Sequence, residues 1–388
     1  MKFKQIVLIF LVAFNLRLGI SSMPPVLTMI QQSFQLTNLQ SSLLTSIPVI
    51  CMGVLAFFVS KIQQSVGREK GIFLFLLLLG GSLLSRGFLV NYSGLLLSAL
   101  FIGFAIAVIG PLLSGYIKQS FPNQSGLLIG IYSLSMGLGS VSASSVMLPL
   151  TRLLDNKWYY ALGSWGILAI ISAVIWYSMQ KDKKKSSVKE NPILLKDVIK
   201  ERSVWKMIVF FGIQSGMFYG LVTWINSALI ERGLSVTFSV GLLTLFTAVQ
   251  MISSFIIPAM MDRIGRIDYW IMSCCILMLA ASGLFLFTTT RISAGIAILC
   301  SAVAAGGFFP IAMLLPIQNS RTAAEASTYT SFVQAFGYIA GGAAPILIGG
   351  LIDLSHNHKS LYITMIVGAA VLFLIGMSEG RRKDEQPS

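Results

Sequence analysis

A single arginine lies in the middle of the first hydrophobic stretch of this chain. Arg17 stands within residues 5–30, and no Asp or Glu lies near the centre of any hydrophobic stretch. A cation at the middle of a bilayer costs about 2.5–3.5 kcal/mol even on a lenient insertion scale, so such a group faces a protein interior or a water-filled cavity and serves a function. Arg17 therefore predicts a pathway for an anion.

Composition indicates that the elements positioning Arg17 are membrane helices. Of the 388 residues, 55% are hydrophobic and only 11% are charged, which leaves too little polar surface to cover a soluble globule. A helix needs about 20 apolar residues to cross a bilayer. We therefore expect an all-α membrane protein of twelve transmembrane helices, at residues 5–30, 39–60, 71–90, 94–118, 125–149, 158–179, 204–230, 239–261, 269–289, 293–318, 327–352 and 361–378.

The net charge of +14 is distributed unevenly along the chain. Most of the 28 Lys and Arg residues fall in alternate loops, and the densest group lies between Lys181 and Lys206. Because Lys and Arg favour the cytoplasmic side, both termini are expected there, in a multi-pass protein of the bacterial cell membrane. The basic segments are expected to meet lipid headgroups rather than nucleic acid.

One long polar segment divides the chain into two halves. Residues 180–203 are expected to form a cytoplasmic linker between an N-terminal six-helix bundle, 1–179, and a C-terminal six-helix bundle, 204–388. The halves echo each other, since Asn15 of the first span corresponds to Gln214 of the seventh. A parallel repeat of this kind places a substrate site near the membrane midplane at the interface of the halves, with access alternating between the two sides. This organisation favours secondary transport.

A short loop after the eighth span carries a family signature. It runs Met261-Asp262-Arg263-Ile264-Gly265-Arg266, which resembles the Asp-Arg-x-Gly-Arg loop of the major facilitator superfamily. The matching loop after the second span, Gln64-Ser65-Val66-Gly67-Arg68, keeps the Gly and the Arg but lacks the Asp. Gly permits a tight turn, and the charged residues can cap helix ends. A gating role without substrate contact is therefore expected for Gly67, Arg68, Asp262, Arg263, Gly265 and Arg266.

Short stretches spread over nearly the whole chain carry a closer resemblance: Asn15-Leu16-Arg17, Ile117-Lys118 with Phe121-Pro122, Phe211-Gly212-Ile213-Gln214-Ser215, Tyr219 with Trp224, Gly306-Gly307-Phe308-Phe309-Pro310, Gln334 with Gly337-Tyr338, and Asp353. With these stretches the chain resembles, within that superfamily, the cyanate/nitroimidazole permease family. The chain departs from the family at Leu18, where Pro usually follows Asn-Leu-Arg, and at Gly110 and Ser114, where the family has Asn and Pro. The resemblance implies a cyanate-like anion or a compact heteroaromatic compound as the substrate.

Helical geometry separates the two polar residues of the first span. Successive residues turn by about 100°, so Asn15 and Arg17 point about 200° apart and cannot both line one cavity in a straight helix. We expect Arg17 to contact the substrate. Asn15 is also a candidate for substrate binding, but its position favours an interhelical hydrogen bond. The alternative for Arg17 is a structural link to backbone carbonyls at a helix break near Pro24-Pro25.

The second half supplies neutral polar and aromatic candidates for substrate binding. Its amides and phenols can donate hydrogen bonds to a carboxylate-like group, with helix-to-helix bonding or close packing as the alternative. Its aromatic rings can form a wall around a small ligand. The alternative for these rings is a position in the core or facing the lipid. The candidates are Gln214, Tyr219, Trp224, Phe309, Gln334 and Tyr338, with Phe308 and, in the fifth span, Tyr132 as weaker ones.

Other residues are assigned structural roles. Arg86, about one turn inside the outer end of the third span, is expected to extend to the headgroups as an anchor, with an anion-attracting residue of the outer vestibule as the alternative. The four cysteines all lie within spans and are expected to be small buried hydrophobic residues rather than disulfides or metal ligands. His356 and His358, near Asp353, are too few for a metal site. No cofactor is predicted, and no motif of an enzyme or of an ATP-driven pump is present.

The lack of acidic residues at depth distinguishes between classes of transporter. Export of cationic drugs generally requires an acid in the cavity, so Arg17 favours a small anion or a weak acid as the substrate. Because uptake of a bare anion opposes an inside-negative potential, we expect a proton or a counter-anion to take part, or the direction to be export. The alternatives are a proton-linked exporter of small neutral drugs and, from another class, a membrane sensor that binds its ligand without moving it.

Overall fold

The structure is a computed structural model that describes residues 2–56, 58–120, 125–180, 201–264, 266–288, 290–319 and 323–384. Within these residues every regular element is a helix. The chain divides into two compact units, Met1–Glu190 and Asn191–Ser388. The division falls inside the predicted linker 180–203, of which residues 181–200 lie outside the described part.

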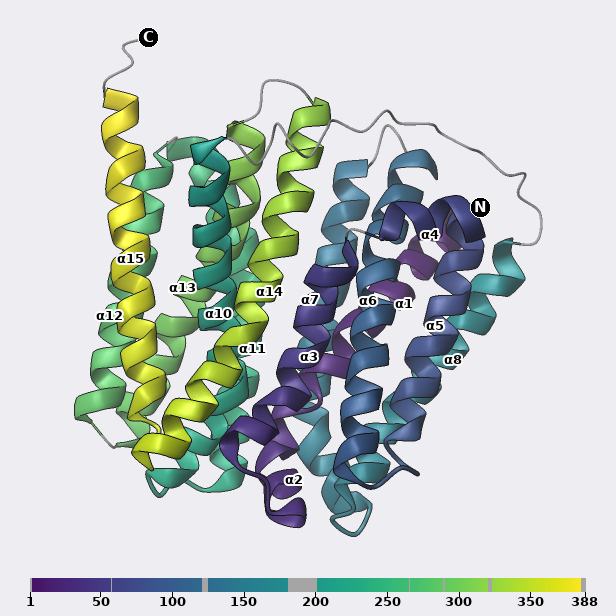
Figure 1. Cartoon of the computed structure of the whole chain (residues 1–388), viewed down its shortest axis with the longest axis horizontal. Coiled ribbons are helices and arrows are strands. Elements are labelled where there is room, and N and C mark those ends of the chain that lie inside the picture. Colours follow the sequence, from purple (N-terminus) through teal and green to yellow (C-terminus); the bar gives the residue numbers. More distant parts are fainter. Residues whose placement is uncertain are drawn as a thin grey trace. The chain divides into compact units, whose positions relative to one another are not determined.

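Each unit is a bundle of membrane helices (Figure 1). Unit 1 contains α1 (Lys2–Ser21), η1 (Pro24–Val26), α2 (Leu27–Phe34), α3 (Asn38–Ala56), α4 (Val59–Val66), α5 (Arg68–Ser85), α6 (Tyr92–Ser120), α7 (Ser125–Leu153) and α8 (Trp158–Gln180). Unit 2 contains α10 (Arg202–Glu231), α11 (Val236–Ile264), α12 (Ile267–Phe287), α13 (Arg291–Gln318), α14 (Ala323–Ser355) and α15 (Lys359–Asp384).

The predicted all-α membrane fold is confirmed, since eleven spans in the described residues are long and apolar enough to cross a bilayer. The twelfth membrane helix is α5. It is not among the eleven because its 18 residues include the charged Arg68, Glu69 and Lys70 in the first turn, which leaves too short an apolar stretch. It packs along α6 and α8, which both belong to the eleven. The third predicted span is wrong at its end, because α5 stops at Ser85 rather than at residue 90.

The first two predicted spans are each interrupted rather than continuous. α1 ends at Ser21, and the short η1 and α2 follow as separate pieces (Figure 1). Proline has no amide hydrogen, so Pro24 cannot continue the helical hydrogen-bond ladder. The Met23 amide already bonds to the Ile20 carbonyl instead of the Gly19 carbonyl. The second span is divided into α3 and α4 between Ala56 and Val59.

The helices pair in the same way in both units. In unit 1, α1 packs on α7, α3 on α6, and α5 on α6 and α8. In unit 2, α10 packs on α14, α11 on α13, and α12 on α13 and α15. The span-by-span correspondence of the two halves is therefore present in three dimensions as well as in the sequence.

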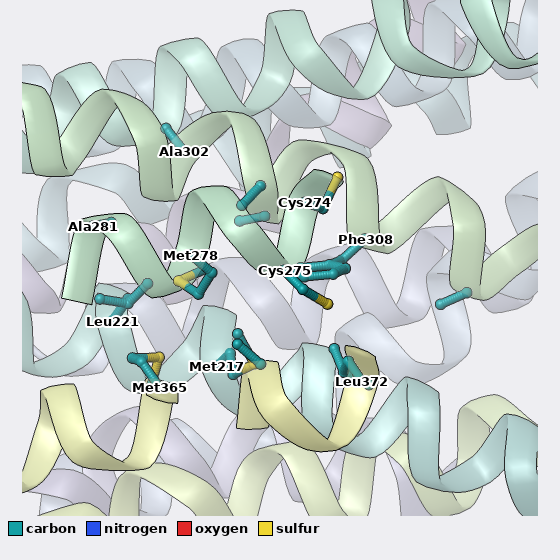
Figure 2. Close-up of a cluster of buried hydrophobic side chains, with 14 of the residues drawn as sticks. Met217, Leu221, Cys274, Cys275, Met278, Ala281, Ala302, Phe308, Met365 and Leu372 are labelled. Carbon is teal, nitrogen blue, oxygen red and sulfur yellow. The ribbon is translucent and has the colours of Figure 1, made fainter. Parts of the chain in front are cut away.

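The core of unit 2 is filled by aliphatic, aromatic and sulfur-containing side chains. Figure 2 shows Met217 and Leu221 of α10 beside Met278 of α12 and Met365 of α15, all of them buried. All four cysteines are free, with Cys274 and Cys275 buried in this core and Cys51 and Cys300 half-buried. The predicted role of Cys274 and Cys275 as small buried residues is thus confirmed.

In unit 1, α1 and α7 approach so closely that only glycine fits where they cross. A Cβ on Gly139 would overlap the carbonyl oxygen of Phe14. The hydroxyls of Ser21 and Ser140 hydrogen-bond across the same pair of helices at 2.7 Å. Small residues and hydroxyl bonds are the means by which membrane helices pack without help from the hydrophobic effect.

Gly139→Ala is expected to lower the free energy of unfolding by about 1–3 kcal/mol, because the added methyl group meets a backbone oxygen and overpacks the crossing. Gly81→Ala in α5 is the matched control, since a Cβ there meets no atom within 4 Å. That variant should be neutral or more stable by up to about 1 kcal/mol. Thermal unfolding of the purified proteins measures both, and equal melting temperatures for the two variants would contradict the close approach.

Candidate functional site

Arg17, Tyr132 and Gly110 come together in unit 1. Arg17 is half-buried on α1, and its charge acts on Tyr132 of α7. The Tyr132 hydroxyl lies 3.5 Å from the position that a Cβ on Gly110 of α6 would take. Three helices thus place a guanidinium and a phenol near a position without a side chain. Both groups can donate hydrogen bonds to an anion.

Asn15 points away from this group, into the packing of unit 1. It is 1% exposed, and its amide nitrogen donates to the Leu11 carbonyl at 2.7 Å and to Ser172 Oγ of α8 at 2.8 Å. The interhelical bond expected from its place on the helix is present. Asn15 therefore orients α1, and we treat any effect on substrate binding as indirect.

Arg86 does not extend to the headgroups, so its predicted role as an anchor is wrong. It is 1% exposed and donates to Ser98 Oγ of α6 and to the Gly19 carbonyl of α1. A carbonyl freed by the helix break is a better partner than the membrane surface for a side chain enclosed by three helices. The link to backbone carbonyls that was the alternative for Arg17 is made by Arg86.

In unit 2, Phe211 of α10 brings two predicted residues together. Its ring meets that of Phe309 on α13 at 6.4 Å between centroids and that of Tyr338 on α14 at 5.1 Å, edge-on in both cases. A Cβ on Gly337 would overlap the Phe211 ring, so glycine is required opposite it. Phe309 and Tyr338 are half-buried, whereas Phe211 is fully buried. These three residues are called the aromatic group below.

The predicted amides and the second phenol of unit 2 lie at different levels around this group. Gln334, one turn before Tyr338, donates from Nε2 to Met313 Sδ at 3.0 Å and is half-buried. Gln214 is 4% exposed and donates to Ser215 Oγ at 2.8 Å. Tyr219 is 5% exposed and its ring meets Phe218 edge-on. Gln334 is thus the amide that shares a helix face with the aromatic group.

Trp224 does not join the aromatic group. It follows Phe211 by thirteen positions on α10, which turns it about 220° around the helix and moves it about 20 Å along the axis. Its indole nitrogen donates to the Pro345 carbonyl at 3.0 Å, and its ring lies 6.1 Å from that of His358. Phe308 faces the core beside Cys275 (Figure 2). A single wall of Trp224, Phe308 and Phe309 is therefore not assembled.

The two loops with the family signature are built differently. Gly67 has a φ of 85°, as a tight turn requires, and the Arg68 guanidinium lies beside Gly115 of α6. In unit 2, Arg266 makes a paired hydrogen bond and salt bridge with Asp268 in the first turn of α12, at 2.9 Å. Gly265 lies outside the described residues, as do the side chains of Asp262 and Arg263.

The histidine of the predicted loop pair forms an ion-pair contact rather than a cluster of ligands. His358 donates its backbone amide to Glu231 Oε2 at 3.1 Å, and its Nδ1 contacts the same oxygen, which joins the end of α10 to the start of α15. His356 lies in the turn before α15 with a φ of 54°. In the described part of the chain, no three His, Cys, Asp or Glu residues are arranged to hold a metal ion.

Two residues of the second unit were not predicted as site residues from the sequence. Phe211 was noted only as part of a family stretch, although a bulky ring opposite Gly337 is the kind of complementary pair that a repeat alignment can reveal. Asn226 of α10 is 1% exposed, and neither end of its amide has a hydrogen-bond partner within the described structure. Nothing in the local sequence distinguishes Asn226 from a helix residue bonded to a neighbour.

Comparison with known proteins gives consistent matches over the whole chain. The family model of the Major Facilitator Superfamily matches residues 9–345. The cyanate transport protein CynX of Escherichia coli (strain K12) is 27% identical over 373 residues, which cover 95% of this chain and 96% of that protein. The 2-nitroimidazole transporter of the same organism is 23% identical over 381 residues, with 97% and 95% covered.

The fold also matches a solved structure. A bacterial homolog of the human lysosomal transporter Spinster, crystallised in an inward-facing and occupied conformation, superposes with a TM-score of 0.79. The match covers 96% of this chain and 94% of that one at 15% sequence identity, so it concerns the fold alone.

Ser172→Ala is expected to lower the free energy of unfolding by about 1–2 kcal/mol, because it leaves the buried Asn15 amide short of a partner. Substrate affinity should not change, since Ser172 lies on α8 and its hydroxyl bonds to Asn15 and to the Leu168 carbonyl of its own helix. Ser178→Ala on the same helix is the control, because that exposed hydroxyl bonds only to Ile175 of its own turn. Thermal unfolding and ligand titration check both claims, and a weaker affinity for Ser172→Ala at unchanged stability would contradict them.

Proposed function

This chain belongs to the Major Facilitator Superfamily, and we propose that it moves a small anion or a weak acid across the membrane by alternating access. The family and the matched relatives are transporters, so the chain is a transporter and not an enzyme. The observation that carries the finer proposal is Arg17, a cation half-buried within a membrane helix. No Asp or Glu stands near the middle of any span to make the pathway suit a cation.

The chemistry around Arg17 favours a small ligand with anionic oxygen or nitrogen atoms. A guanidinium presents parallel N–H groups that suit planar or two-pronged acceptors. The Tyr132 hydroxyl adds a donor, and Gly110 leaves space beside it. The names of two relatives, a cyanate transport protein and a 2-nitroimidazole transporter, are consistent with a compact ligand of this kind.

In unit 2, we assign direct contact with the substrate to the half-buried candidates. These are Phe309, Tyr338 and Gln334, which lie on or beside the aromatic group and can meet a flat ligand with ring edges and an amide. Gln214 and Tyr219 are more deeply buried and are proposed as secondary contacts. Asn15 and Trp224 are proposed to affect substrate binding indirectly, through the hydrogen bonds by which they join neighbouring helices.

The orientation proposed from the charge distribution places both termini in the cytoplasm of a bacterial cell. In that orientation the basic segment between Lys181 and Lys206 faces the anionic inner leaflet. The loops that contain Arg68 and Arg266 then lie on the cytoplasmic side, where the gating role proposed for them would be exercised.

A second candidate function is export of small neutral drugs. It is favoured by the name of the 2-nitroimidazole transporter and by the aromatic group, which can bind a flat uncharged ligand without Arg17. A non-transporting sensor is separated from both by uptake of a radiolabelled ligand into vesicles.

Arg17→Gln is expected to weaken the binding of sodium cyanate or of a small carboxylate by about 10- to 100-fold, the equivalent of one charged hydrogen-bonded contact. Expression and melting temperature should stay close to those of the unaltered protein. Arg232→Gln is the matched control, because Arg232 donates to the Thr288 carbonyl at the end of α10 and is not part of the site. Titration by thermal shift measures both variants.

Unaltered affinity in Arg17→Gln would remove Arg17 from the site, and retained transport of neutral nitroimidazoles would favour the second candidate.

Transport in proteoliposomes is expected to depend on a pH gradient or on a counter-anion. Moving one negative charge into an inside-negative compartment costs about 2.3 kcal/mol per 100 mV, so accumulation requires a compensating proton or anion. Flux of radiolabelled anion should therefore rise when the outside is acidified or when anion is loaded inside. Flux that responds to neither would contradict the coupled transport of an anion.

A further inference from the structure

Arg86 is a buried cation that the proposed site does not use. It follows the last residue of α5, at the start of the turn to α6, and is 1% exposed. No carboxylate in the described part of the chain lies within salt-bridge distance of it. A guanidinium in such surroundings depends on other acceptors to offset the loss of water.

The acceptors of Arg86 come from two helices other than its own. Nε donates to Ser98 Oγ of α6 at 3.0 Å, and Nη1 donates to the Gly19 carbonyl of α1 at 3.1 Å. Gly19 lies in the last turn of α1, where unsatisfied carbonyls carry the partial negative charge of the helix end. Arg86 itself follows the C-terminus of α5. The carbonyl at the end of α1 and the Ser98 hydroxyl therefore take the place of a carboxylate.

The Gly19 carbonyl is available because of the helix break that follows it. The Met23 amide, its regular partner in an α-helix, bonds to Ile20 at 3.3 Å. Gly19 is also packed tightly, since a Cβ there would lie 2.8 Å from Ile102 Cγ2. The end of α1 is thus held both by contact and by the Arg86 hydrogen bond.

Gly19 and Arg17 belong to the same uninterrupted helix. They are two residues apart, which corresponds to about 3 Å along the axis and about 200° around it. A shift or a rotation of the helix at Gly19 therefore moves the Arg17 side chain by a similar amount relative to Tyr132.

We infer that Arg86 is a positioning residue for Arg17: by holding the Gly19 carbonyl next to Ser98, it sets the depth and the rotation of α1. The inference rests on the proposed function in that Arg17 is taken as the substrate contact, and Arg86 itself touches no substrate. The remaining donor, Nη2, is buried without a partner. It allows the guanidinium to bond a second carbonyl when α1 moves, so that one side chain can hold α1 in more than one position of the transport cycle.

The first experiment measures the place of residue 17 without any ligand. The four native cysteines are replaced by Ser, Arg17→Cys is introduced, and the rate of modification by a small charged thiol reagent is measured with and without Arg86→Lys. Lysine keeps the positive charge but lacks the planar guanidinium, whose separate N–H groups bond to the Gly19 carbonyl and to the Ser98 hydroxyl at the same time. We expect the rate to change by about tenfold, the equivalent of ~1.4 kcal/mol. Arg232→Gln in the same background is the control and should leave the rate unchanged.

The second experiment measures affinity for sodium cyanate in the protein that retains Arg17. Arg86→Lys should raise the dissociation constant by about tenfold and Ser98→Ala by about threefold, at equal folded fractions. A double-mutant cycle of Arg86→Lys with Arg17→Lys should be non-additive, because both changes act on the same contact. A purely structural role would lower the melting temperature and leave the thiol rate, the affinity and the additivity unchanged.

The two experiments separate the failure of this inference from the failure of the proposed function. An unchanged thiol rate in Arg86→Lys overturns the inference, whatever the ligand. An altered rate that Arg232→Gln also produces overturns it as well, because the effect is then not specific to this bond. An altered rate found only with Arg86→Lys supports it, even if no small anion binds the unaltered protein, in which case the proposed function alone fails.

Discussion

The structure of unit 1 depends on how positive charge is held inside a bundle of membrane helices. A guanidinium at the bilayer centre costs about 2.5–3.5 kcal/mol on the lenient scale, and burial without partners costs several times more. Unit 1 carries two arginines within its membrane helices, Arg17 near the middle of a span and Arg86 near the end of one, and no Asp or Glu lies near the middle of any span. Arg86 is stabilised by a carbonyl and a hydroxyl, whereas Arg17 is half-buried and its charge acts on the Tyr132 phenol. The two buried charges of unit 1 thus have different surroundings, and we assign substrate contact to Arg17 alone.

Unit 2 has the same helix pairing but a different chemistry. Its first helix, α10, runs without a break from Arg202 to Glu231, so no carbonyl is freed at mid-helix to hold a buried arginine. Instead, the Phe211 ring of α10 meets the rings of Phe309 on α13 and Tyr338 on α14. The arginines Arg232 and Arg266 lie at helix ends and bond to the Thr288 carbonyl and to Asp268. Charge and aromatic surface are therefore divided between the two units, although both derive from one repeat.

The sequence predicted the helices and their division into two halves better than it predicted the partners of single side chains. Hydropathy indicated all the membrane helices, and the helix period placed Asn15 and Arg17 on different faces, as the Asn15–Ser172 bond bears out. Arg86 was misassigned because its distance from the end of a span does not reveal whether a neighbouring helix offers an acceptor. The Gly19 carbonyl becomes one only through the break at Pro24, and the break was expected only as an alternative for Arg17. Contacts of this kind depend on the register between helices, which no single helix encodes.

Leu18 bears on how a bond at Gly19 can influence Arg17, because it keeps the helix regular between the two positions. A Pro in place of Leu18 would lack the amide, free the carbonyl four residues earlier and bend the helix beside the arginine. Here Leu18 keeps α1 helical through Ser21, and the Phe14 carbonyl is packed against Gly139 instead. The break moves to Pro24, beyond the site. Arg17 therefore lies on an uninterrupted helix that is bonded to Arg86 at Gly19 and packed against α7 at Gly139. These two contacts, rather than a local kink, are the ones that we infer to set the position of Arg17.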